Sequence, residues 1–369
     1  MKILVISSHT PSLFIFRLDM MKSFQELGCD VIAAGPGSTQ EWHNKFEKNH
    51  IQYYQIPVSR NGLNPYNDIK TILCLRNLLK RIHPDKIFVY HAKTVAYGCI
   101  AARMCGITEV YPMIAGLGSI LRGTGFKNWI VKGIMFALYR NAFKCSQKVF
   151  FQNDDDIQEM LHHDLIDKTK AVKINGSGVN LTIFQVAPFP CSPAFLYVGR
   201  LIRDKGIGEY LEACKKIKTQ YPEVRCLLVG PYDSNPSSLT PRDLQPYIEY
   251  GIIEYFGEQL DVRPFIEQCT TLVLPSYHEG TPKAVLEAMA MGRSVLTSDA
   301  PGCRETVIDG ENGFLVPVKD IDGLVEKMGY LISHMDTAAA MGKISRKIAE
   351  DKFNVSIVNR MIVDTMKIS

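Results

Sequence analysis

The stretch of sequence that indicates the fold most clearly is SYHEGTPKAVLEAMA, residues 276–290. A short apolar run, Thr271–Pro275, precedes it, and the segment after Pro282 is apolar on nearly every side. The Gly-Thr-Pro sequence between the two predicts a turn, and Pro282 is suited to the first turn of a helix. A strand that passes through a tight turn into a helix is the unit from which parallel α/β sheets are built.

Two glutamates in this stretch are candidates for ligand binding. Glu279 lies in the turn, and Glu287, eight positions later, is the only charged residue between Ala284 and Gly292. A buried carboxylate is costly unless hydrogen-bond donors surround it, and a polyhydroxyl ligand such as the ribose of a nucleotide supplies such donors. The alternative is an i,i+4 ion pair between Lys283 and Glu287 on a half-exposed helix. The sequence leaves both interpretations open.

The rest of the chain predicts two successive α/β domains. Short apolar runs alternate with helix-length amphipathic segments, which is typical of doubly wound parallel sheets, and 369 residues exceed one typical core. The expected strands are Ile3–Ser7, Val31–Ala34, Lys86–Tyr90, Glu109–Met113, Lys148–Gln152, Ala194–Val198, Arg225–Val229, Ile253–Phe256, Thr271–Pro275 and Ser294–Thr297. The expected helices lie near residues 15–27, 66–82, 94–105, 127–145, 206–219, 261–269 and 283–291.

The proline-containing segment 184–193 is the predicted linker between the domains. We therefore expect a Rossmann-like first domain at residues 1–185, a second at 186–352, and a last segment, 353–369, that forms a helix and returns to the first domain. Doubly wound sheets bind ligands beyond the carboxyl ends of their strands. The two domains are accordingly expected to face each other across a cleft lined by these strand ends.

The charge is distributed unevenly between the two halves. Residues 1–185 contain 22 Lys and Arg against 14 Asp and Glu, whereas the remainder contains 20 against 24. A basic first half favours an anionic partner, either a phosphate-bearing substrate or an anionic membrane surface. A nucleic-acid partner is not expected.

The cysteines and the apolar segments predict a cytoplasmic protein. Ten cysteines are scattered without a Cys-x-x-Cys pair, which indicates reduced, buried thiols rather than disulfides or a zinc site. The apolar run Ile3 to Ile6 is too short for a signal peptide, and no stretch approaches the roughly 20 residues that span a bilayer. A peripheral position on the inner face of the cell membrane remains compatible with this pattern.

A second group of candidates follows the strand Ala194–Val198. Gly199 and Arg200 end that strand, and Lys205 comes shortly before the next expected helix. Cations beside the N–H groups of a helix N-terminus form a phosphate site. The alternative is solvated surface charge, which is our interpretation of Arg203.

Arg200, Lys205, Glu279 and Glu287 together resemble the retaining glycosyltransferases of family 4, which have the GT-B fold. The resemblance covers nearly the whole chain. Residues 199–206 resemble the donor-diphosphate clamp of that family, and residues 279–287 its E-x7-E element. Residues 177–180 with Phe184 resemble its interdomain hinge, and residues 309–316 its late turn and strand; an ordinary glycine-containing turn would also explain the last segment.

The resemblance implies roles for individual residues. Arg200 and Lys205 would neutralise the leaving diphosphate, Glu279 would lie near the donor sugar, and Glu287 would bind the ribose. The other expected donor contacts are Gly199, Gly280, Thr281 and Lys283. We expect no metal and no cofactor beyond the nucleotide sugar itself, a UDP-sugar, because the acidic run 154–156 is better explained as charge at a helix N-terminus.

His91, which ends the strand Lys86–Tyr90, is a candidate for binding the reacting sugar. A packed structural histidine is the alternative, and Lys93 could be the aligned cation instead. The loop Ser7–Ser12 lacks the glycines that many relatives carry after the first strand, so no donor contact is assigned to it. Arg17 either faces an acceptor diphosphate or lies on the surface.

The segment between Glu109 and Asp154 contains no acidic residue, and its composition predicts a membrane-facing surface. Aromatic and aliphatic residues alternate there with basic ones, which is typical of helices that lie on a membrane; a core-packing helix with a basic solvated face is the alternative. The basic residues are Arg122, Lys127, Lys132, Arg140, Lys144 and Lys148. Residues 116–119 and 60–65 resemble loops of family members that extend polyprenyl-diphosphate-linked saccharides.

These observations together predict a metal-independent, retaining glycosyltransferase. It would transfer an N-acetylhexosamine or a hexose from a nucleotide diphosphate, a UDP-sugar, to a polyprenyl-diphosphate-linked saccharide in surface polysaccharide or glycan assembly. One alternative is a sugar-nucleotide epimerase of the same fold, which would leave the basic segment unexplained. The other is a non-catalytic subunit that binds a sugar nucleotide or a lipid.

Overall fold

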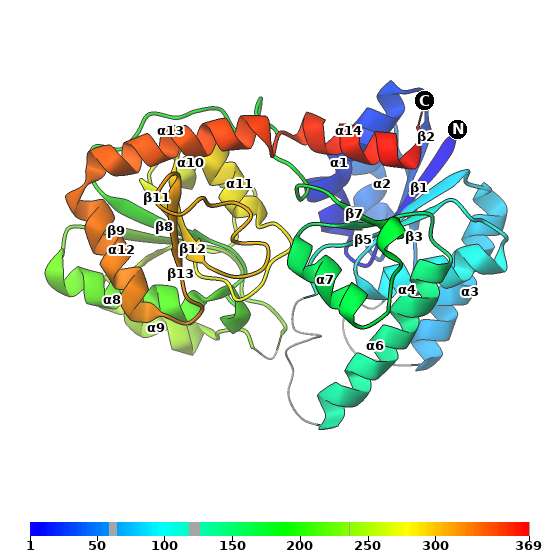
Figure 1. The fold of residues 1–369 in the computed structure, drawn as a ribbon, viewed down its shortest axis with the longest axis horizontal. Helices are drawn as coiled ribbons and strands as arrows, with labels where there is room; N and C mark the ends of the chain where they lie inside the picture. Colours follow the sequence, from blue (N-terminus) through cyan, green and yellow to red (C-terminus); the bar gives the residue numbers. More distant parts are fainter. Residues whose placement is uncertain (59–64, 118–125, 236, 369) are drawn as a thin grey trace. The chain divides into compact units, whose positions relative to one another are not determined.

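The computed structural model describes residues 1–58, 65–117, 126–235 and 237–368 (Figure 1). The chain separates into two compact units, the first formed by Met1–Ser177 together with the end of the chain from Val355, the second by Gly178–Asn354. The first boundary falls within the hinge-like residues 177–180, and the prolines of segment 184–193 lie inside the second unit. There the buried guanidinium of Arg293 donates to the carbonyl oxygens of Ala187 and Pro188 at 3.2 and 2.8 Å.

The first unit contains a parallel sheet with the strand order β3-β2-β1-β4-β5-β6-β7. Its strands are β1 (Lys2–Ser7), β2 (Asp30–Gly35), β3 (Gln52–Gln55), β4 (Lys86–Tyr90), β5 (Val110–Ile114), β6 (Val149–Phe151) and β7 (Ala171–Lys173). Successive side chains of a strand point to opposite faces, so Ile3 and Val5 enter one hydrophobic core and Leu4 and Ile6 the other. A strand buried on both faces reads as a continuous apolar run.

Helices cover both faces of this sheet. α1 (Thr10–Glu26), α2 (Thr39–Glu47) and α14 (Val355–Met366) contribute to the core that contains Ile3. α3 (Pro65–Ile82), α4 (Ala92–Met104) and α6 (Phe126–Lys144) contribute to the core that contains Leu4. α7 (Asp154–His162) and the short helix η1 (Lys168–Lys170) follow β6. The last helix therefore lies in the first unit, where it packs against α1 and the Asn359 amide donates to Ser23 Oγ at 3.1 Å.

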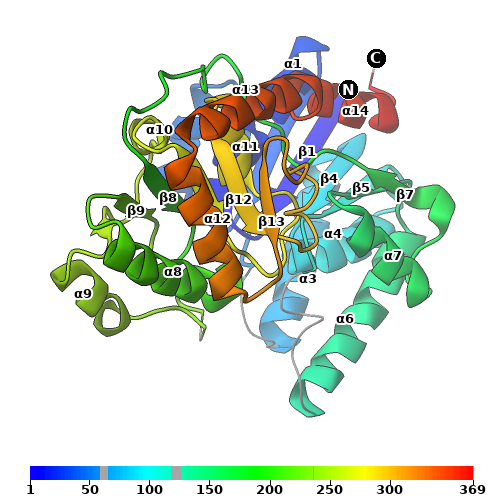
Figure 2. The same ribbon diagram turned by 60° about the vertical axis from the view of Figure 1, so that its left-hand side comes forward.

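The second unit contains a parallel sheet with the order β10-β9-β8-β11-β12-β13. Its strands are β8 (Ala194–Val198), β9 (Arg225–Val229), β10 (Glu254–Tyr255), β11 (Thr271–Leu274), β12 (Ser294–Ser298) and β13 (Gly313–Val316). Its helices are η2 (Arg203–Lys205), α8 (Ile207–Gln220), α9 (Pro241–Glu249), α10 (Arg263–Ile266), α11 (Lys283–Ala290), α12 (Ile321–Ser333) and α13 (Met335–Asp351). α8 packs beside α12, and α11 packs beside α13 (Figure 2).

Each sheet has one position where the strand order reverses, and these positions place the candidate residues. β1 lies between β2 and β4 in the first sheet, and β8 lies between β9 and β11 in the second. The loops that follow the two adjacent strands at such a position leave the sheet in opposite directions. Doubly wound sheets bind their ligands there. In the first unit it brings together Ser7 and His91. In the second it brings together Arg200 and the turn that contains Glu279.

The predicted fold class, two Rossmann-like domains with parallel sheets, is confirmed. All ten cysteines are free, and six of them are buried. Within the ranges that the structure describes, no helix has both the length and the apolar character needed to cross a bilayer.

Candidate active site

Eight of the nine predicted site residues lie in the second unit, and His91 lies in the first. Those of the second unit follow the adjacent strands β8 and β11, which pair in parallel through Phe195 and Leu196. Because parallel neighbours present their carboxyl ends at the same edge, residues more than 70 positions apart in sequence come into contact there.

Arg200 is held by an acidic partner that the sequence analysis missed. Its Nη1 lies 2.8 Å from Oδ2 of Asp233, which follows the neighbouring strand β9. Asp233 is fixed in turn, since its Oδ1 accepts from the N–H of Asn235 at 2.8 Å. The Arg200 side chain is 37% exposed and that of Asp233 is 13% exposed, so the guanidinium is both oriented and accessible. The backbone before Arg200 is also fixed, because the N–H of Gly199 donates to the carbonyl oxygen of Val229 at 3.0 Å.

Lys205 and Glu279 form an ion pair between Nζ and Oε1. The same carboxylate oxygen accepts from Oγ of Ser276 at 2.8 Å. The side chains of Lys205 and Glu279 are 23% and 11% exposed, so the pair is largely withdrawn from solvent. The two predicted site residues therefore lie in direct contact, with the serine as an unpredicted third member.

Hydrogen bonds fix the loop after β8 and join it to the loop after β11. The hydroxyl of Tyr197 donates toward the carbonyl oxygens of Arg200 and Lys205, at 3.3 and 3.2 Å. Burial raises the pKa of Tyr197 well above its usual value, so this hydroxyl stays protonated and able to donate. The carbonyl of Asp204 accepts from the N–H of Tyr277 at 2.9 Å. Both cations are therefore presented from a backbone that is itself fixed.

Two glycines allow the close approach of these loops. Gly302 has φ +79°, and a Cβ at this position would lie 2.2 Å from the carbonyl oxygen of Glu279 and 2.3 Å from that of Gly280. Gly206 has φ +71°, and its Cβ would lie 2.0 Å from the carbonyl oxygen of Pro275. No other residue type fits either position without moving the site backbone.

Glu287 lies on α11 and is buried, with 9% of its surface exposed. Lys283 Nζ is 4.0 Å from its Oε1, so the i,i+4 pair exists. The alternative of a half-exposed helix is nevertheless wrong, because the apolar surroundings of α11 enclose the carboxylate. Burial raises the pKa of Glu287 to about 7, with Lys283 opposing that shift and Asp261 adding to it.

The raised pKa of Glu287 predicts a pH-dependent stability. A carboxyl whose pKa is higher in the folded than in the unfolded chain stabilises the fold fully below the unfolded pKa, here 4.5, and that contribution is lost as the pH rises through about 7. Relative to Glu287→Gln, the free energy of unfolding of the natural chain should fall by roughly 3 kcal/mol between pH 4.5 and 8. Urea unfolding of both chains across this range measures the difference. Parallel pH profiles would show that the carboxyl is not perturbed.

Gly280 and Thr281 link Glu279 to α11, which begins at Lys283 with Pro282 as its N-cap residue. Pro282 thus lies immediately before the first helical turn rather than in it. Gly280 follows Glu279, and its carbonyl oxygen lies close to Gly302. Thr281 lies at the N-terminus of α11. A helix N-terminus is a favourable place for a phosphate or a polar sugar group.

In the first unit, Nδ1 of His91 lies 3.0 Å from Oγ of Ser7. Lys93, the alternative to His91, forms a largely buried ion pair with Asp68 at 3.0 Å. The expectation of a surface position for Arg17 is wrong: it is 2% exposed, and its guanidinium lies 5.2 Å from the Tyr90 ring centre. Burial lowers the pKa of Arg17 to about 10.

Sequence reasoning missed Asp233, Ser276 and Tyr197. One signal could have identified Asp233, because it closely follows the apolar strand β9 as Arg200 follows β8. The predicted helix start at Asp154 is confirmed, with Asn153 as the N-cap. Among the residues that the structure describes, no group of three or more His, Cys, Asp or Glu side chains could hold a metal ion.

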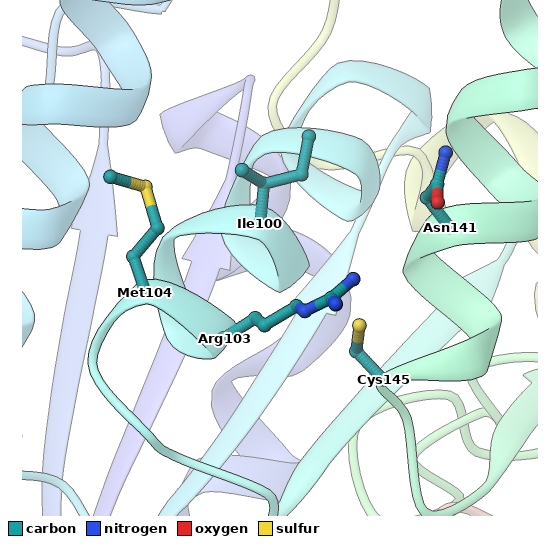
Figure 3. A pocket seen from close by; sticks show the side chains of 5 residues that line it. All are labelled: Ile100, Arg103, Met104, Asn141 and Cys145. Atoms are coloured by element: carbon teal, nitrogen blue, oxygen red, sulfur yellow. The ribbon is translucent and has the colours of Figure 1, made fainter.

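Of the two predicted acceptor loops, residues 60–64 of segment 60–65 and residues 118–119 of segment 116–119 lie outside the described residues, and so does Arg122. A hollow of about 350 Å³ lies between α4 and α6, where Arg103 extends toward Cys145 (Figure 3). Arg103 and Met104 form the last residues of α4. This hollow therefore lies at the end of α4 opposite His91, and it is not part of the candidate site.

Comparison with known proteins identifies relatives of both units. Residues 2–153 match the family described as Glycosyl transferase 4-like, and residues 192–334 match Glycosyl transferases group 1. The chain is 27% identical over 350 residues to the N,N'-diacetylbacillosaminyl-diphospho-undecaprenol alpha-1,3-N-acetylgalactosaminyltransferase of Campylobacter jejuni, covering 90% of this chain and 89% of that one.

Two further matches complete the comparison. The chain is 25% identical over 296 residues to the UDP-Gal:alpha-D-GlcNAc-diphosphoundecaprenol alpha-1,3-galactosyltransferase of Escherichia coli, covering 75% and 74% of the two chains. The crystal structure of a glycosyltransferase from Rickettsia africae superposes with a TM-score of 0.79 at 20% identity, over 99% of this chain and 97% of the other. At that identity the superposition shows a shared fold.

Proposed function

Because this chain belongs to glycosyltransferase family 4 and has the GT-B fold, we propose that it transfers a sugar from a nucleotide diphosphate to a polyprenyl-diphosphate-linked saccharide. The donor is a UDP-sugar, the sugar is an N-acetylhexosamine or a hexose, and the product enters surface polysaccharide or glycan assembly. The two relatives from Campylobacter jejuni and Escherichia coli act, by their names, on diphosphoundecaprenol-linked sugars. The observation that carries the proposal is the pairing of two cations that follow β8 with two partly buried carboxylates, Asp233 after β9 and Glu279 after β11.

The proposed role of Arg200 and Lys205 is to bind the donor diphosphate. Cleavage of the bond between the sugar and the phosphate builds negative charge on the leaving oxygen, and fixed cations stabilise that charge without reorganising. Arg200 can make two parallel bonds to a phosphate, whereas Lys205 acts as a compact positive charge. With the leaving group neutralised in this way, the proposed reaction needs no metal ion and no cofactor.

The remaining residues position the nucleotide and the sugar. The ribose hydroxyls donate to the carboxylate of Glu287, because a buried carboxylate is stabilised by hydrogen-bond donors. Gly199, Gly280, Thr281 and Lys283 provide further donor contacts, from loops whose backbones the structure holds in place. Glu279 and His91 contact the reacting sugar.

We propose that the reaction retains the configuration of the donor sugar. The bond between the anomeric carbon and the phosphate oxygen breaks, and the acceptor hydroxyl forms its new bond from the same face of the sugar. Its proton passes to the oxygen of the leaving diphosphate. The product is then a lipid-linked saccharide that is longer by one sugar, together with the nucleoside diphosphate.

The proposal is tested with labelled UDP-sugars, each incubated with and without a polyprenyl-diphosphate saccharide and in the presence of EDTA. We expect transfer only when the lipid is present, unaffected by EDTA, with the donor's anomeric configuration preserved in the product. Isomerisation of the donor without an acceptor would identify an epimerase instead. Binding of the donor without turnover would identify a non-catalytic subunit.

The acceptor is held in a membrane, and we propose that the first unit binds the cytoplasmic face of an anionic bilayer. The helices α3 and α6 both pack against α4 (Figure 1). Both of them carry exposed apolar side chains. On α3 they recur at a three- and four-residue spacing, which places them on one helix face. The exposed residues are Tyr66, Ile69 and Leu73 on α3 and Trp129, Ile130 and Ile134 on α6.

Two basic residues of the predicted membrane-facing segment are bound to neighbouring loops of the first unit. Arg140 donates to the carbonyl oxygens of Asp164 and His163, at 3.2 and 3.1 Å, and Lys148 donates to that of Thr169 at 2.7 Å. These two cations therefore fasten α6 and β6 to neighbouring loops. The apolar residues of α6, rather than these cations, are the appropriate ones to change in a test.

Replacing Trp129 and Ile130 together by serine should weaken binding to anionic vesicles about tenfold or more, because two large apolar side chains no longer enter the bilayer. The matched control replaces Ile248 and Tyr250, an exposed apolar pair on the second unit, by serine. Vesicle co-sedimentation at low and high salt measures both. Equal losses in the two double variants would contradict a membrane surface on α6.

A further inference from the structure

Arg17, on α1, is a buried cation without an acidic partner. It is 2% exposed, and its Nη2 lies 3.2 Å from the sulfur of Met113, which is only a weak acceptor. Its Nε is enclosed and has no hydrogen-bond partner. Among the residues that the structure describes, no carboxylate forms an ion pair with the guanidinium. Its charge is therefore not neutralised within the described part of the chain.

Two aromatic rings hold this guanidinium in place. Its Cζ lies 5.2 Å from the ring centre of Tyr90 and 5.9 Å from that of Phe88. A cation is attracted to the face of an aromatic ring, but the ring does not neutralise the charge as a carboxylate does. The pKa of Arg17, lowered by burial to about 10, still leaves it protonated at neutral pH. The rings therefore fix a guanidinium that remains charged.

The charge of Arg17 does not serve the stability of the fold. Removing an unpaired cation from water costs free energy, and the lowered pKa has this cause, because burial disfavours the charged form. Arg293, in the second unit, is also buried, but its guanidinium is paired with the backbone. It donates at 2.8 to 3.3 Å to the carbonyl oxygens of Ala187, Pro188, Ile266 and Glu267.

Arg17 lies at the edge of the first sheet where ligands are expected. Helix side chains point toward the N-terminus, so the guanidinium of Arg17 lies nearer to the start of α1 than its own Cα does. Its neighbour Tyr90 is the last residue of β4, and the Tyr90 hydroxyl is 2.8 Å from Oγ of Ser12 in the first turn of α1. The Tyr90 ring centre is also 4.5 Å from that of His91. Arg17 and the predicted sugar-binding residue His91 therefore contact the same ring.

The N-terminus of α1 adds positive charge at this edge. The helix has 17 residues, and its first turn contains no acidic residue. A helix N-terminus carries a partial positive charge, which an acidic side chain in the first turn would offset. Because a guanidinium lies near it instead, the surroundings favour an anion, and above all a phosphate group.

We propose that Arg17 is a diphosphate-binding residue of the first unit and that its Nη1 donates to an oxygen of that group. Nε and Nη2 face the protein interior, which leaves Nη1 for the ligand. This inference rests on the proposed function, in which both substrates carry a diphosphate: it joins the sugar to the nucleoside in one and the saccharide to the lipid in the other. The bound oxyanion supplies the negative charge that an ion pair within the protein would otherwise provide.

The first test compares the two buried arginines by urea unfolding. Arg17→Met removes the charge and keeps an unbranched side chain that packs well against aromatic rings. Its unfolding midpoint should equal or exceed that of the natural chain, because an unpaired buried charge is removed. Arg293→Met is the matched control, and its midpoint should fall, because carbonyl oxygens lose their hydrogen-bond donor. A fall in Arg17→Met comparable to that in Arg293→Met would show that Arg17 serves the fold and would overturn the proposal.

Calorimetric titration of the full chain tests the ligand. The probes are UDP, which carries the diphosphate of the sugar donor, and farnesyl diphosphate, a short polyprenyl diphosphate that represents the acceptor. Arg17→Met should bind one of them about tenfold more weakly or worse, because a charged hydrogen bond is lost. Loss for farnesyl diphosphate assigns Arg17 to the acceptor, and loss for UDP assigns it to the sugar donor.

The control for the titration is Lys22→Met, which removes an exposed cation from the same helix. It should change either affinity by less than about twofold, since an exposed charge is screened by solvent. Unchanged affinity of Arg17→Met for both probes would overturn the proposal, and so would equal losses in Lys22→Met.

The same measurements separate this inference from the proposed function. If the natural chain transfers sugar and Arg200→Ala abolishes transfer, while Arg17→Met binds both probes as tightly as the natural chain does, the proposed function stands and this inference fails. If the natural chain binds a diphosphate through Arg17 but transfers no sugar, the diphosphate site stands and the proposed function fails.

Discussion

Replacing Arg200 by alanine should lower kcat about 10²- to 10³-fold while the chain remains folded. The guanidinium is oriented by Asp233 and 37% exposed, so its removal takes away a preorganised charge and opens no core cavity. An interaction that strengthens as charge develops in the transition state changes kcat more than it changes ground-state binding. Steady-state kinetics with saturating acceptor measure the effect, and the thermal unfolding midpoint measures the fold.

The matched control is Arg203→Ala, because Arg203 lies three residues away on η2 and is exposed. It should alter turnover by less than about twofold, since an exposed charge is screened by solvent. Equal losses in the two variants would indicate a general effect of positive charge in this loop. Unchanged turnover in Arg200→Ala would remove Arg200 from the site.

Replacing Lys205 by methionine should lower kcat about 10²-fold and also reduce stability. The variant replaces the charged side chain by an uncharged one of similar size, so the diphosphate loses a cation and Oε1 of Glu279 loses its ion pair with Lys205. A partly buried carboxylate that loses its partner costs about 1–3 kcal/mol. Urea unfolding and turnover are therefore both expected to change.

Combining Lys205→Met with Glu279→Gln in a double variant separates the effect on turnover from the effect on stability. In the double variant, stability should recover relative to Lys205→Met, because a neutral amide replaces the carboxylate that lost its ion pair, whereas turnover should stay low. Lys216→Met removes an exposed ion pair with Asp322 and serves as the control for charge removal on the same unit. Recovery of turnover in the double variant would mean that Lys205 serves only to neutralise Glu279.

Much of the fold could be predicted from the sequence, because the central strands are buried on both faces. Ala194–Val198 and Arg225–Val229 have the predicted bounds, since each reads as an apolar run between polar loops. β3, with the sequence QYYQ, was missed because it lies at a sheet edge and has half of its residues exposed. β7 has only three residues, all half-buried, so it carries no periodic signal.

The candidate site could be predicted in part, for a similar reason. Arg200 and Glu279 are recognisable from the sequence because each is a charged residue within five positions of the end of a buried strand. Their partners are set by the strand order, which the local sequence does not show: Asp233 depends on β9 lying beside β8. The contact between Ser7 and His91 likewise depends on β1 lying beside β4.

The placement of α14 bears on how the chain is made. The first unit needs residues from both ends of the sequence, since α14 packs against α1, whereas the second unit is a single continuous segment. During translation the second unit is therefore complete before the first unit, although most of the first unit is synthesised earlier. Until α14 has been synthesised and has left the ribosome, the apolar surface of α1 that α14 covers stays exposed.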